Sequence, residues 1–502
     1  MYIISKFILI LRQTAALALL PLLAWSCQLV VDDYDCENNI YDDANQYINV
    51  TISVSASDSP VTRATPKGGE YGDGAEKGID TRENRVNDIT LIFFQDDAGV
   101  NTANINTKVL FVKKYNVHEA TSDDYPYAHT HKDTEPTSNY YNKEIIYSTG
   151  NQRLEETLLQ IGQTYQVLVV ANADPMVVAG DKIVDVRNKV QTMAYSGTGV
   201  GVDATNFVMA SETSAKVTLS NPKVVSEENK CIYYFNCIHI ERLAARIDFW
   251  ANKSEGYKTS ADNAAYIIPG YEYKVWKSTD TTEPTSLDRF VLTSITPFNL
   301  NNGNEYVIKR TNDTSAPYLH DESNTNWVID PYTTGKNGTA HPDYLVSKLT
   351  DVTTTLANAY NVTMADQLAN KLTISEKDNI IVGYTKENTL RPDGDTPLYY
   401  YATGLAFEGY YYKNGTGTGE RRVYYHFIRH QGEQDTPYEA YTPANIDNAK
   451  TTYCPASTAM NFGIVRNNIY RISINKIKEN DVLDLKIKVK KWDKFTHEVI
   501  YM

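Results

Sequence analysis

Apolar and polar residues alternate strictly in a short segment near the start of the chain, from Tyr47 to Ala56. One face of this segment carries four large aliphatic residues, Ile48, Val50, Ile52 and Val54. A period of two over this length predicts a half-buried β-strand. Since burying one large aliphatic side chain is worth about 1.5–3 kcal/mol, the four together would stabilise a domain by about 6–12 kcal/mol at most.

Short strand-like runs recur along the rest of the chain, separated by Gly, Asn and Pro. The predicted strands are Asp88–Gln95, Lys108–Lys114, Glu144–Ser148, Tyr165–Ala171, Asn206–Ala210, Cys231–Ile240, Arg289–Ile295, Tyr306–Arg310, Leu398–Phe407, Arg421–Arg429, Ile464–Ile477 and Leu483–Lys491. Residues 302–303 predict a hairpin, and spacings of three and four predict helices near residues 183–190 and 364–372. This pattern predicts a mainly β fold with two β-sandwich domains and short helical inserts.

Length and composition agree with this picture. A chain of 502 residues is too long for one ordinary core. Its 38 tyrosines against 13 phenylalanines favour pleated sheets that are partly exposed to water. The formal charge of −14 and the lack of a basic stripe indicate that nucleic acid is not a partner.

The N-terminus has the order of a signal peptide. Lys6 and Arg12 precede an apolar stretch, Ala15–Trp25, and Ser26-Cys27 follows it. The apolar stretch is too short to span a bilayer, which needs about 20 residues. Its end, LAWSC, resembles a bacterial lipobox, and the resemblance implies that Cys27 is lipidated; a plain secretory signal is the alternative. Residues 28–43 carry six carboxylates and no basic residue, which favours an extended, solvated tract.

A loop rich in Gly, Pro and Ser follows the first strand, over residues 57–78. Within it the bond between Arg63 and Ala64 is predicted to be accessible to a trypsin-like protease. Arg82 and Arg85 are less favourable sites because they adjoin the predicted strand Asp88–Gln95. An ordinary N-terminal strand followed by a loop without function is the alternative interpretation.

The order of lipobox, acidic tract, first strand and Thr-Arg-Ala loop resembles the fimbrillin precursor, the type V pilin of the Bacteroidales. The resemblance implies that an Arg-specific surface protease removes the first strand at Arg63. It also implies that Ile48, Val50, Ile52 and Val54 plug a hydrophobic groove until then. Loss of the strand leaves this groove open along an edge, where a strand donated by another subunit can fill it.

Two further segments resemble the same family. IHIERLAARIDFW, from Ile238 to Trp250, resembles the opening of the second fimbrillin domain, and Arg242 and Arg246 within it are predicted to pair with carboxylates at a domain seam. FGIVRNNIYRISINKI and LDLKIKVKKW resemble the end of the family's C-terminal domain. The predicted division is 1–27 for the signal peptide and lipobox, 28–63 for the acidic tract and removable strand, and 64–237 and 238–502 for the two sandwich domains.

The last predicted strand matches the first in its apolar pattern. Leu483, Leu485, Ile487 and Val489 recur at every second residue, which makes this segment a candidate donor strand for a neighbouring subunit. The alternative is that it is the last strand of its own domain. In that case donation falls to Trp492–Met502.

No sequence motif of hydrolases, metalloproteases or nucleotide-binding enzymes is present, so we expect no enzymatic activity, cofactor or metal site. The resemblance implies a structural subunit of a cell-surface fimbria, lipidated in the outer membrane as a precursor. Its implied partners are other copies of itself, other fimbrial subunits, outer-membrane lipid, the protease and adhesion ligands. Two alternatives stay open: a tip adhesin of the same fimbria, and a carbohydrate-binding surface lipoprotein that uses the tyrosines at 399–401, 410–412 and 424–425.

Overall fold

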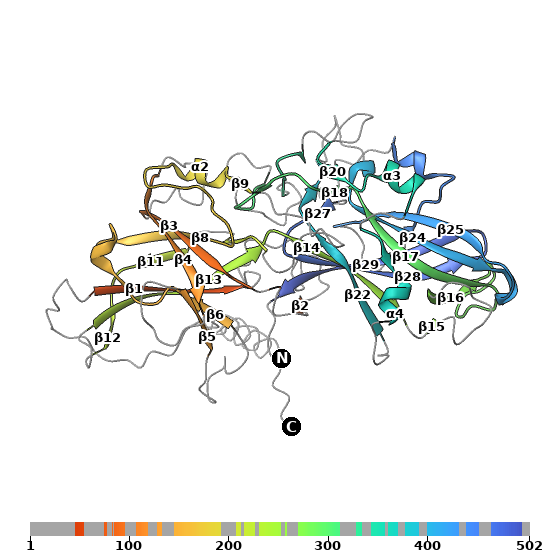
Figure 1. Cartoon of the computed structure of the whole chain (residues 1–502), viewed down its shortest axis with the longest axis horizontal. Coiled ribbons are helices and arrows are strands. Elements are labelled where there is room, and N and C mark those ends of the chain that lie inside the picture. Colours follow the sequence, from red (N-terminus) through yellow and green to blue (C-terminus); the bar gives the residue numbers. More distant parts are fainter. Residues whose placement is uncertain are drawn as a thin grey trace, which may run out of the picture.

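The computed structural model describes residues 46–54, 75–77, 83, 85–95, 107–118, 128–132, 145–191, 207–211, 215–225, 230–252, 257–258, 270–311, 328–333, 343–356, 360–369, 377–390, 399–430, 438–450 and 463–493. The fold is mainly β, as predicted. Figure 1 shows two β-rich lobes side by side, one from each half of the chain, called here the N-lobe and the C-lobe. The helices of the described part are short: α2 (Ile183–Arg187), α3 (Leu349–Thr354), α4 (Met364–Ala369) and the 3-10 turns η4 (Leu154–Glu156), η7 (Tyr399–Tyr401), η8 (Lys413–Gly415) and η9 (Ile446–Lys450).

The N-lobe contains a sheet of 11 strands. They are β1 (Gln46–Val54), β3 (Asp88–Gln95), β4 (Val109–His118), β5 (Ala128–Lys132), β6 (Ile145–Ser148), β7 (Gln152–Arg153), β8 (Thr164–Ala171), β10 (Met209–Ala210), β11 (Ala215–Thr218), β12 (Lys223–Val225) and β13 (Lys230–Arg242). The pairings run from β13 through β10, β8, β3, β4, β5 and β6 to β1, and β1 pairs with β13 again. The strands therefore form a closed circuit in which β1 is the closing member.

The C-lobe contains a sheet of 12 strands. They are β2 (Ala75–Lys77), β14 (Ala245–Asn252), β15 (Tyr257–Lys258), β16 (Gly270–Trp276), β17 (Arg289–Phe298), β21 (Val362–Thr363), β22 (Lys377–Thr385), β24 (Gly404–Tyr412), β25 (Glu420–Phe427), β26 (Tyr438–Glu439), β28 (Asn468–Lys478) and β29 (Val482–Asp493). Three two-stranded pairings complete the described strands: β18 (Leu300–Asn301) with β20 (Leu345–Val346), β19 (Glu305–Tyr306) with β9 (Val190–Gln191), and β23 (Asn388–Thr389) with β27 (Gly463–Ile464).

Each lobe has its own apolar core. The N-lobe cluster runs from Ile48 to Ala244 and adds three side chains from the second half of the chain, Val307, Ile308 and Ile469. The main C-lobe cluster begins at Ala245. The predicted boundary at residues 237–238 thus falls inside β13, and the two cores meet at the step from Ala244 to Ala245.

Several predicted elements differ from the observed ones. The predicted hairpin at residues 302–303 is wrong, because β18 before it pairs with β20, whereas β19 after it pairs with β9 in the first half of the chain. The predicted strand Leu398–Phe407 is partly wrong, since η7 occupies its first half and β24 begins at Gly404. The two predicted helices correspond to α2 and α4, both shorter than expected.

Candidate functional site

The first strand lies between two sets of neighbours in the N-lobe sheet. β1 runs parallel to β13, from Gln46 opposite Cys231 to Val54 opposite Ile240. On its other side it runs antiparallel to β6 and β7. β1 therefore has paired strands on both sides, and its removal would open a groove between β13 on one side and β6 and β7 on the other. We call the space that β1 occupies the β1 slot.

The apolar face of β1 is fully buried. Ile48, Val50, Ile52 and Val54 are at most 3% exposed and belong to the N-lobe core. The prediction that this face points into a core is confirmed. By the same measure as before, the four contribute about 6–12 kcal/mol at most to the N-lobe.

The polar face of β1 is buried as well, so the prediction of a half-buried strand is wrong. Asn49 and Thr51 are 7% and 8% exposed. The Asn49 Nδ2 donates to Asn151 Oδ1 at 3.0 Å, and the Thr51 hydroxyl donates to the Phe235 carbonyl oxygen at 3.3 Å. Each of these two buried side chains thus has a hydrogen-bond partner in a neighbouring segment, as buried polar groups require.

A β-bulge in β13 adapts the slot to β1. Val50 lies opposite Phe235, but Ile52 lies opposite Ile238, so β13 uses one residue more than β1 over this step. A bulge interrupts the ladder of backbone hydrogen bonds. The Thr51 hydroxyl compensates by donating to the Phe235 carbonyl at this position. The slot therefore selects both an apolar face and a small hydroxyl side chain opposite the bulge.

The candidate donor strand lies in its own lobe. Leu483, Leu485, Ile487 and Val489 are at most 1% exposed and belong to the C-lobe core. β29 pairs antiparallel with β28 along its length. Of the two alternatives left open by the sequence, the chain adopts the one in which this strand completes its own domain. Cys27, Arg63 and Ala64 lie outside the described residues.

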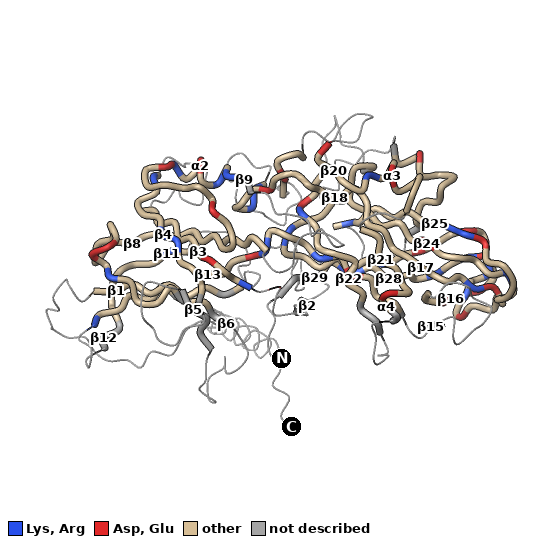
Figure 2. Tube along the Cα trace, viewed as in Figure 1, with Lys and Arg blue, Asp and Glu red and all other residues tan. Residues whose placement is uncertain are grey.

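Buried charges join the lobes at a seam, defined here by Glu83, Arg242, Arg246, Asp248 and Tyr384; Figure 2 shows basic and acidic positions where the lobes meet. The Arg246 guanidinium donates to Glu83 at 3.0 Å and to Asp248 at 2.9 Å, with both side chains fully buried in each pair. Burial alone would lower the pKa of Arg246, but the Asp248 and Glu83 carboxylates outweigh it, so this pKa is raised. The predicted pairing of Arg246 with carboxylates is confirmed.

Arg242 contacts the seam through a backbone carbonyl and a side-chain amide. Its Nε donates to the backbone carbonyl of Glu83 at 2.8 Å and its Nη1 to Asn467 Oδ1 at 3.1 Å. The sequence pointed to the arginines but missed their acidic partner. Glu83 stands alone between two arginines in a stretch without apolar periodicity, and no pattern marks it as buried.

A second buried network reinforces the contact between the lobes. The Lys309 ammonium lies 3.0 Å from Glu241 at the end of β13. The Arg466 guanidinium lies 2.6 Å from Glu387, and both side chains are fully buried. Because breaking a buried ion pair leaves an uncompensated charge, the pair of Lys309 with Glu241 of the N-lobe opposes separation of the lobes.

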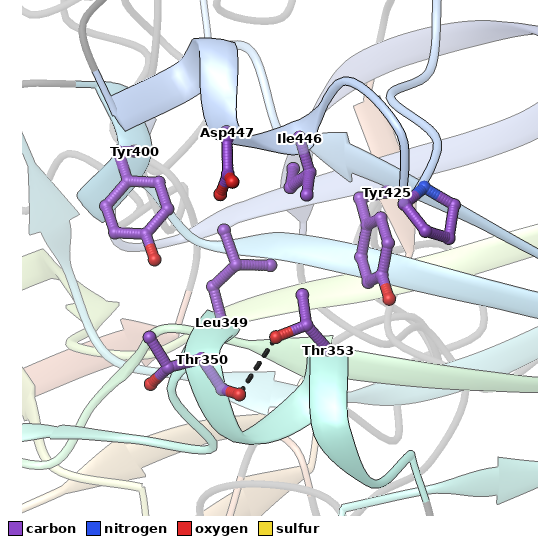
Figure 3. A pocket seen from close by; sticks show the side chains of 8 residues that line it. Leu349, Thr350, Thr353, Tyr400, Tyr425, Ile446 and Asp447 are labelled. Atoms are coloured by element: carbon purple, nitrogen blue, oxygen red, sulfur yellow. Dashed lines mark hydrogen bonds between the residues drawn. The ribbon is translucent and has the colours of Figure 1, made fainter.

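The tyrosine-rich segments proposed for sugar stacking are mostly core. Six of their side chains are at most 8% exposed: Tyr400, Tyr401, Tyr411, Tyr412, Tyr424 and Tyr425. Figure 3 shows a cavity of about 230 Å³ between α3 and η9, with Tyr400 and Tyr425 among the residues that line it. These two rings are only 4% and 2% exposed, so neither presents a free face on which a sugar ring could stack.

No candidate metal or membrane-spanning element stands out in the described segments. Within them, no group of three or more His, Cys, Asp and Glu side chains is placed to hold a metal ion. Over the same residues, no helix is both long and apolar enough to cross a membrane.

Two β lobes joined by a buried polar seam, with the first strand held in a slot, define the architecture. Neither a protein-family model nor a curated protein matches the sequence. Among solved structures, the chain is similar to a fimbrilin from Porphyromonas gingivalis W83 (11% identity, 90% of this chain and 99% of that chain, TM-score 0.39). It is also similar to the tip fimbrial protein Mfa3 from Porphyromonas gingivalis (10% identity, 89% and 100%, TM-score 0.37). A third similar structure is a cell-adhesion candidate from Parabacteroides distasonis (12% identity, 91% and 100%, TM-score 0.41). Identities and TM-scores are low, so the assignment of function depends on the β1 slot.

Proposed function

We propose that this protein is a structural subunit of a cell-surface fimbria of the type V pilin class. It assembles when β1 leaves its slot and a strand from a neighbouring subunit takes its place. One observation carries the proposal: β1 is buried on both faces, yet all its strand partners are distant in sequence. The contacts of Asn49, Val50 and Thr51 reach across 102, 99 and 184 residues. A strand held only by distant segments can leave without unravelling a hairpin.

The empty slot would favour a replacement strand. Loss of β1 exposes apolar core at four positions and leaves the facing backbone groups of β13, β6 and β7 without partners. Unpaired strand edges next to apolar pockets are a template for strand addition from another chain. In the proposal a strand from a neighbouring subunit takes this place, and each subunit fills the slot of the next.

Release of β1 is assigned to an Arg-specific protease that cuts between Arg63 and Ala64. The test compares the wild type with Arg63→Ala, and with Arg421→Ala as a control at an arginine in β25 of the C-lobe whose side chain is 54% exposed. After protease treatment, the wild type and the control should form fibres visible by electron microscopy, and Arg63→Ala should stay monomeric. Fibres of normal length from Arg63→Ala would show that this cut is not required.

The donated strand is assigned to Trp492–Met502 rather than to Leu483–Val489, because the latter fill their own core. In protein already cut at Arg63, deletion of residues 494–502 should give a folded monomer that does not polymerise. Normal polymerisation of the shortened chain would overturn this assignment and leave the β1 slot assignment intact.

Lipid attachment at Cys27 is proposed to hold the precursor in the outer membrane until β1 is released, at the cell surface. Cys27→Ser should abolish acyl labelling. Undiminished labelling would exclude Cys27 as the lipidated residue.

A tip adhesin of the same fimbria is the alternative that the fibre assay separates, since a tip subunit would be cut without polymerising alone. The carbohydrate-binding alternative is not favoured, because six of the eight tyrosines on which it depends are buried.

A further inference from the structure

The chain contains three arginines between β1 and β3, namely Arg63, Arg82 and Arg85, and a protease specific for arginine would have to choose among them. The choice of Arg63 over the other two arginines rests on the proposed function, in which an Arg-specific protease releases β1. The described residues in this region are β2, Glu83 and Arg85–Asn87. They lie on the C-terminal side of the proposed cut.

Glu83 is fixed at both its backbone and its side chain. Its carboxylate accepts from Arg246 at 3.0 Å and from the Tyr384 hydroxyl at 2.7 Å, and its backbone carbonyl accepts from Arg242 at 2.8 Å. The side chain is fully buried. Tyr384 also packs its ring edge-on against Phe207 of the N-lobe, with 5.1 Å between ring centroids. Glu83 therefore cannot move out of the seam without breaking contacts to both lobes.

Arg85 is exposed, but hydrogen bonds fix the peptide bond between Arg85 and Val86. The Arg85 carbonyl accepts from Asn172 Nδ2 at 2.8 Å, and the Val86 N–H donates to the Tyr147 hydroxyl at 3.3 Å. Val86 itself is 3% exposed. The next N–H, of Asn87, donates to Asn172 Oδ1 at 2.6 Å. A protease must draw an extended segment into its active site, and here successive backbone groups are already engaged.

The segment is also attached to the C-lobe upstream of Glu83. β2 pairs parallel with the end of β29, from Ala75 opposite Lys491 to Lys77 opposite Asp493. Along the chain, Ala75–Lys77 thus contact the C-lobe sheet, Glu83 the seam and residues 85–87 the N-lobe. None of these attachments is made by a residue of β1 itself.

We propose that Glu83 and Asn172 are specificity-determining residues for maturation, which protect the bonds after Arg82 and Arg85 and so restrict cleavage to Arg63. We call Glu83, Asn172 and the backbone that they hold the anchor. The anchor also keeps the start of the matured chain joined to both lobes, so β1 leaves without loosening the seam.

The test is limited digestion of the full chain with a purified Arg-specific protease, with the cut sites mapped by mass spectrometry. Two variants weaken the anchor. Glu83→Gln removes the charge that faces Arg246 with little change in shape. Asn172→Gly removes the side-chain bonds to Arg85 and Asn87, and glycine tolerates the left-handed backbone at this position, where φ is 59°. Asn221→Gly is the matched control, since Asn221 also has a positive φ of 53° and is exposed.

In the wild type and in Asn221→Gly, cleavage after Arg85 should be slow compared with cleavage after Arg63. In Asn172→Gly cleavage after Arg85 should rise by about tenfold or more, because proteolysis follows the population of the locally open state. In Glu83→Gln cleavage after Arg82 and Arg85 should rise similarly. Cuts confined to these bonds indicate local opening, whereas additional cuts after the buried Arg187 and Arg242 indicate global unfolding.

Wild-type protein that is cut after Arg85 as fast as after Arg63 would overturn the proposal, as would unchanged cut sites in Asn172→Gly. If Glu83→Gln unfolds globally, Asn172→Gly alone decides. The digestion does not depend on fibre formation. If the proposed fimbrial assembly is wrong, the protein will be cut at Arg63 but will not polymerise. If the anchor is wrong, the cut sites themselves will differ from those expected.

Discussion

β1 and β29 have the same apolar pattern in the sequence and different positions in the fold. Each carries four large aliphatic residues at alternate positions, all of them buried. β29 follows β28 after the three residues Glu479–Asp481 and pairs with it as a hairpin. β1 has no hairpin partner among the described residues and pairs with β13, β6 and β7, which follow about 90 to 190 residues later.

The two strands also differ on their polar faces. On the polar face of β29, Asp484 is 8% exposed but Lys488 is exposed, whereas Asn49 and Thr51 of β1 are both buried and hydrogen-bonded. β29, whose polar face is partly exposed and which pairs with β28 in a hairpin, completes its own lobe. A strand that fills a slot on both faces, and has no hairpin partner among the described residues, is suited to exchange.

The largest expected effect comes from placing a carboxylate in each core. Leu485→Asp should abolish the folded C-lobe, because an uncompensated buried charge costs about 3–5 kcal/mol, a large part of a typical domain stability of about 5–15 kcal/mol. Ile52→Asp should instead expel β1 and leave the C-lobe folded. Hydrogen exchange would show faster exchange confined to β1, β13, β6 and β7 in Ile52→Asp.

Ile52→Val is the conservative control and should cost only about 0.5–1.5 kcal/mol, with β1 still docked. Global unfolding of Ile52→Asp, with fast exchange throughout the C-lobe, would contradict the view that β1 is a separable unit.

Acid should weaken the C-lobe through a buried histidine. Burial, aided by the charge of Arg429, lowers the pKa of His426 in β25 from 6.5 to about 3. The unfolded chain therefore takes up a proton below pH 6.5 that the folded chain does not. Folding stability is present above pH 6.5 and falls as the pH drops toward 3, by at most about 1.4 kcal/mol per pH unit.

Thermal unfolding between pH 6.5 and 5 measures this effect. The C-lobe transition should shift to lower temperature with acid in the wild type and shift less in His426→Gln, with the N-lobe transition as the internal reference. An identical acid dependence in His426→Gln would assign the loss of stability to other groups.

The smallest effects compare the two polar faces. Thr51→Val keeps the shape and removes the hydroxyl that bonds to Phe235, so it should cost about 0.5–1.5 kcal/mol. Lys488→Ala, on the exposed face of β29, should change stability by less than about 0.5 kcal/mol. Chemical denaturation of both variants gives the comparison, and equal costs would argue that the two faces are equally exposed.

The sequence allowed the fold class, most strands and the apolar faces of β1 and β29 to be predicted, because alternation reports which side of a strand meets a core. It did not reveal that the other face of β1 is buried. That depends on Asn151 and Phe235, which lie 102 and 184 residues from their partners, at a register set by a bulge.

The sequence predicted the basic residues of the polar seam but not their acidic partner. Arg242 and Arg246 lie in a regular strand pattern, whereas Glu83 lies in a segment without any periodicity. The abundance of tyrosine predicted sheets that are partly exposed to water. Tyr401 and Tyr424 are instead at most 1% exposed, because their rings pack within the C-lobe.

Exchange of β1 is tested most directly by a reversible lock on the slot. Asn49 lies opposite Tyr234 in the parallel pair of β1 and β13. Adjacent strands are about 4.8 Å apart, within the range of about 4.4–6.8 Å between Cα atoms that a disulfide spans. In the double variant Asn49→Cys, Tyr234→Cys a disulfide should therefore hold β1 in place after the chain is cut.

The measurement is light scattering of the cut, oxidised double variant before and after addition of a reductant, with Asn49→Cys alone as the control. The account predicts that the oxidised protein stays monomeric and that fibres form once the reductant frees β1, while the single variant forms fibres in both conditions. Fibres of equal yield from the oxidised double variant, with β1 shown by mass spectrometry to be still attached, would contradict it.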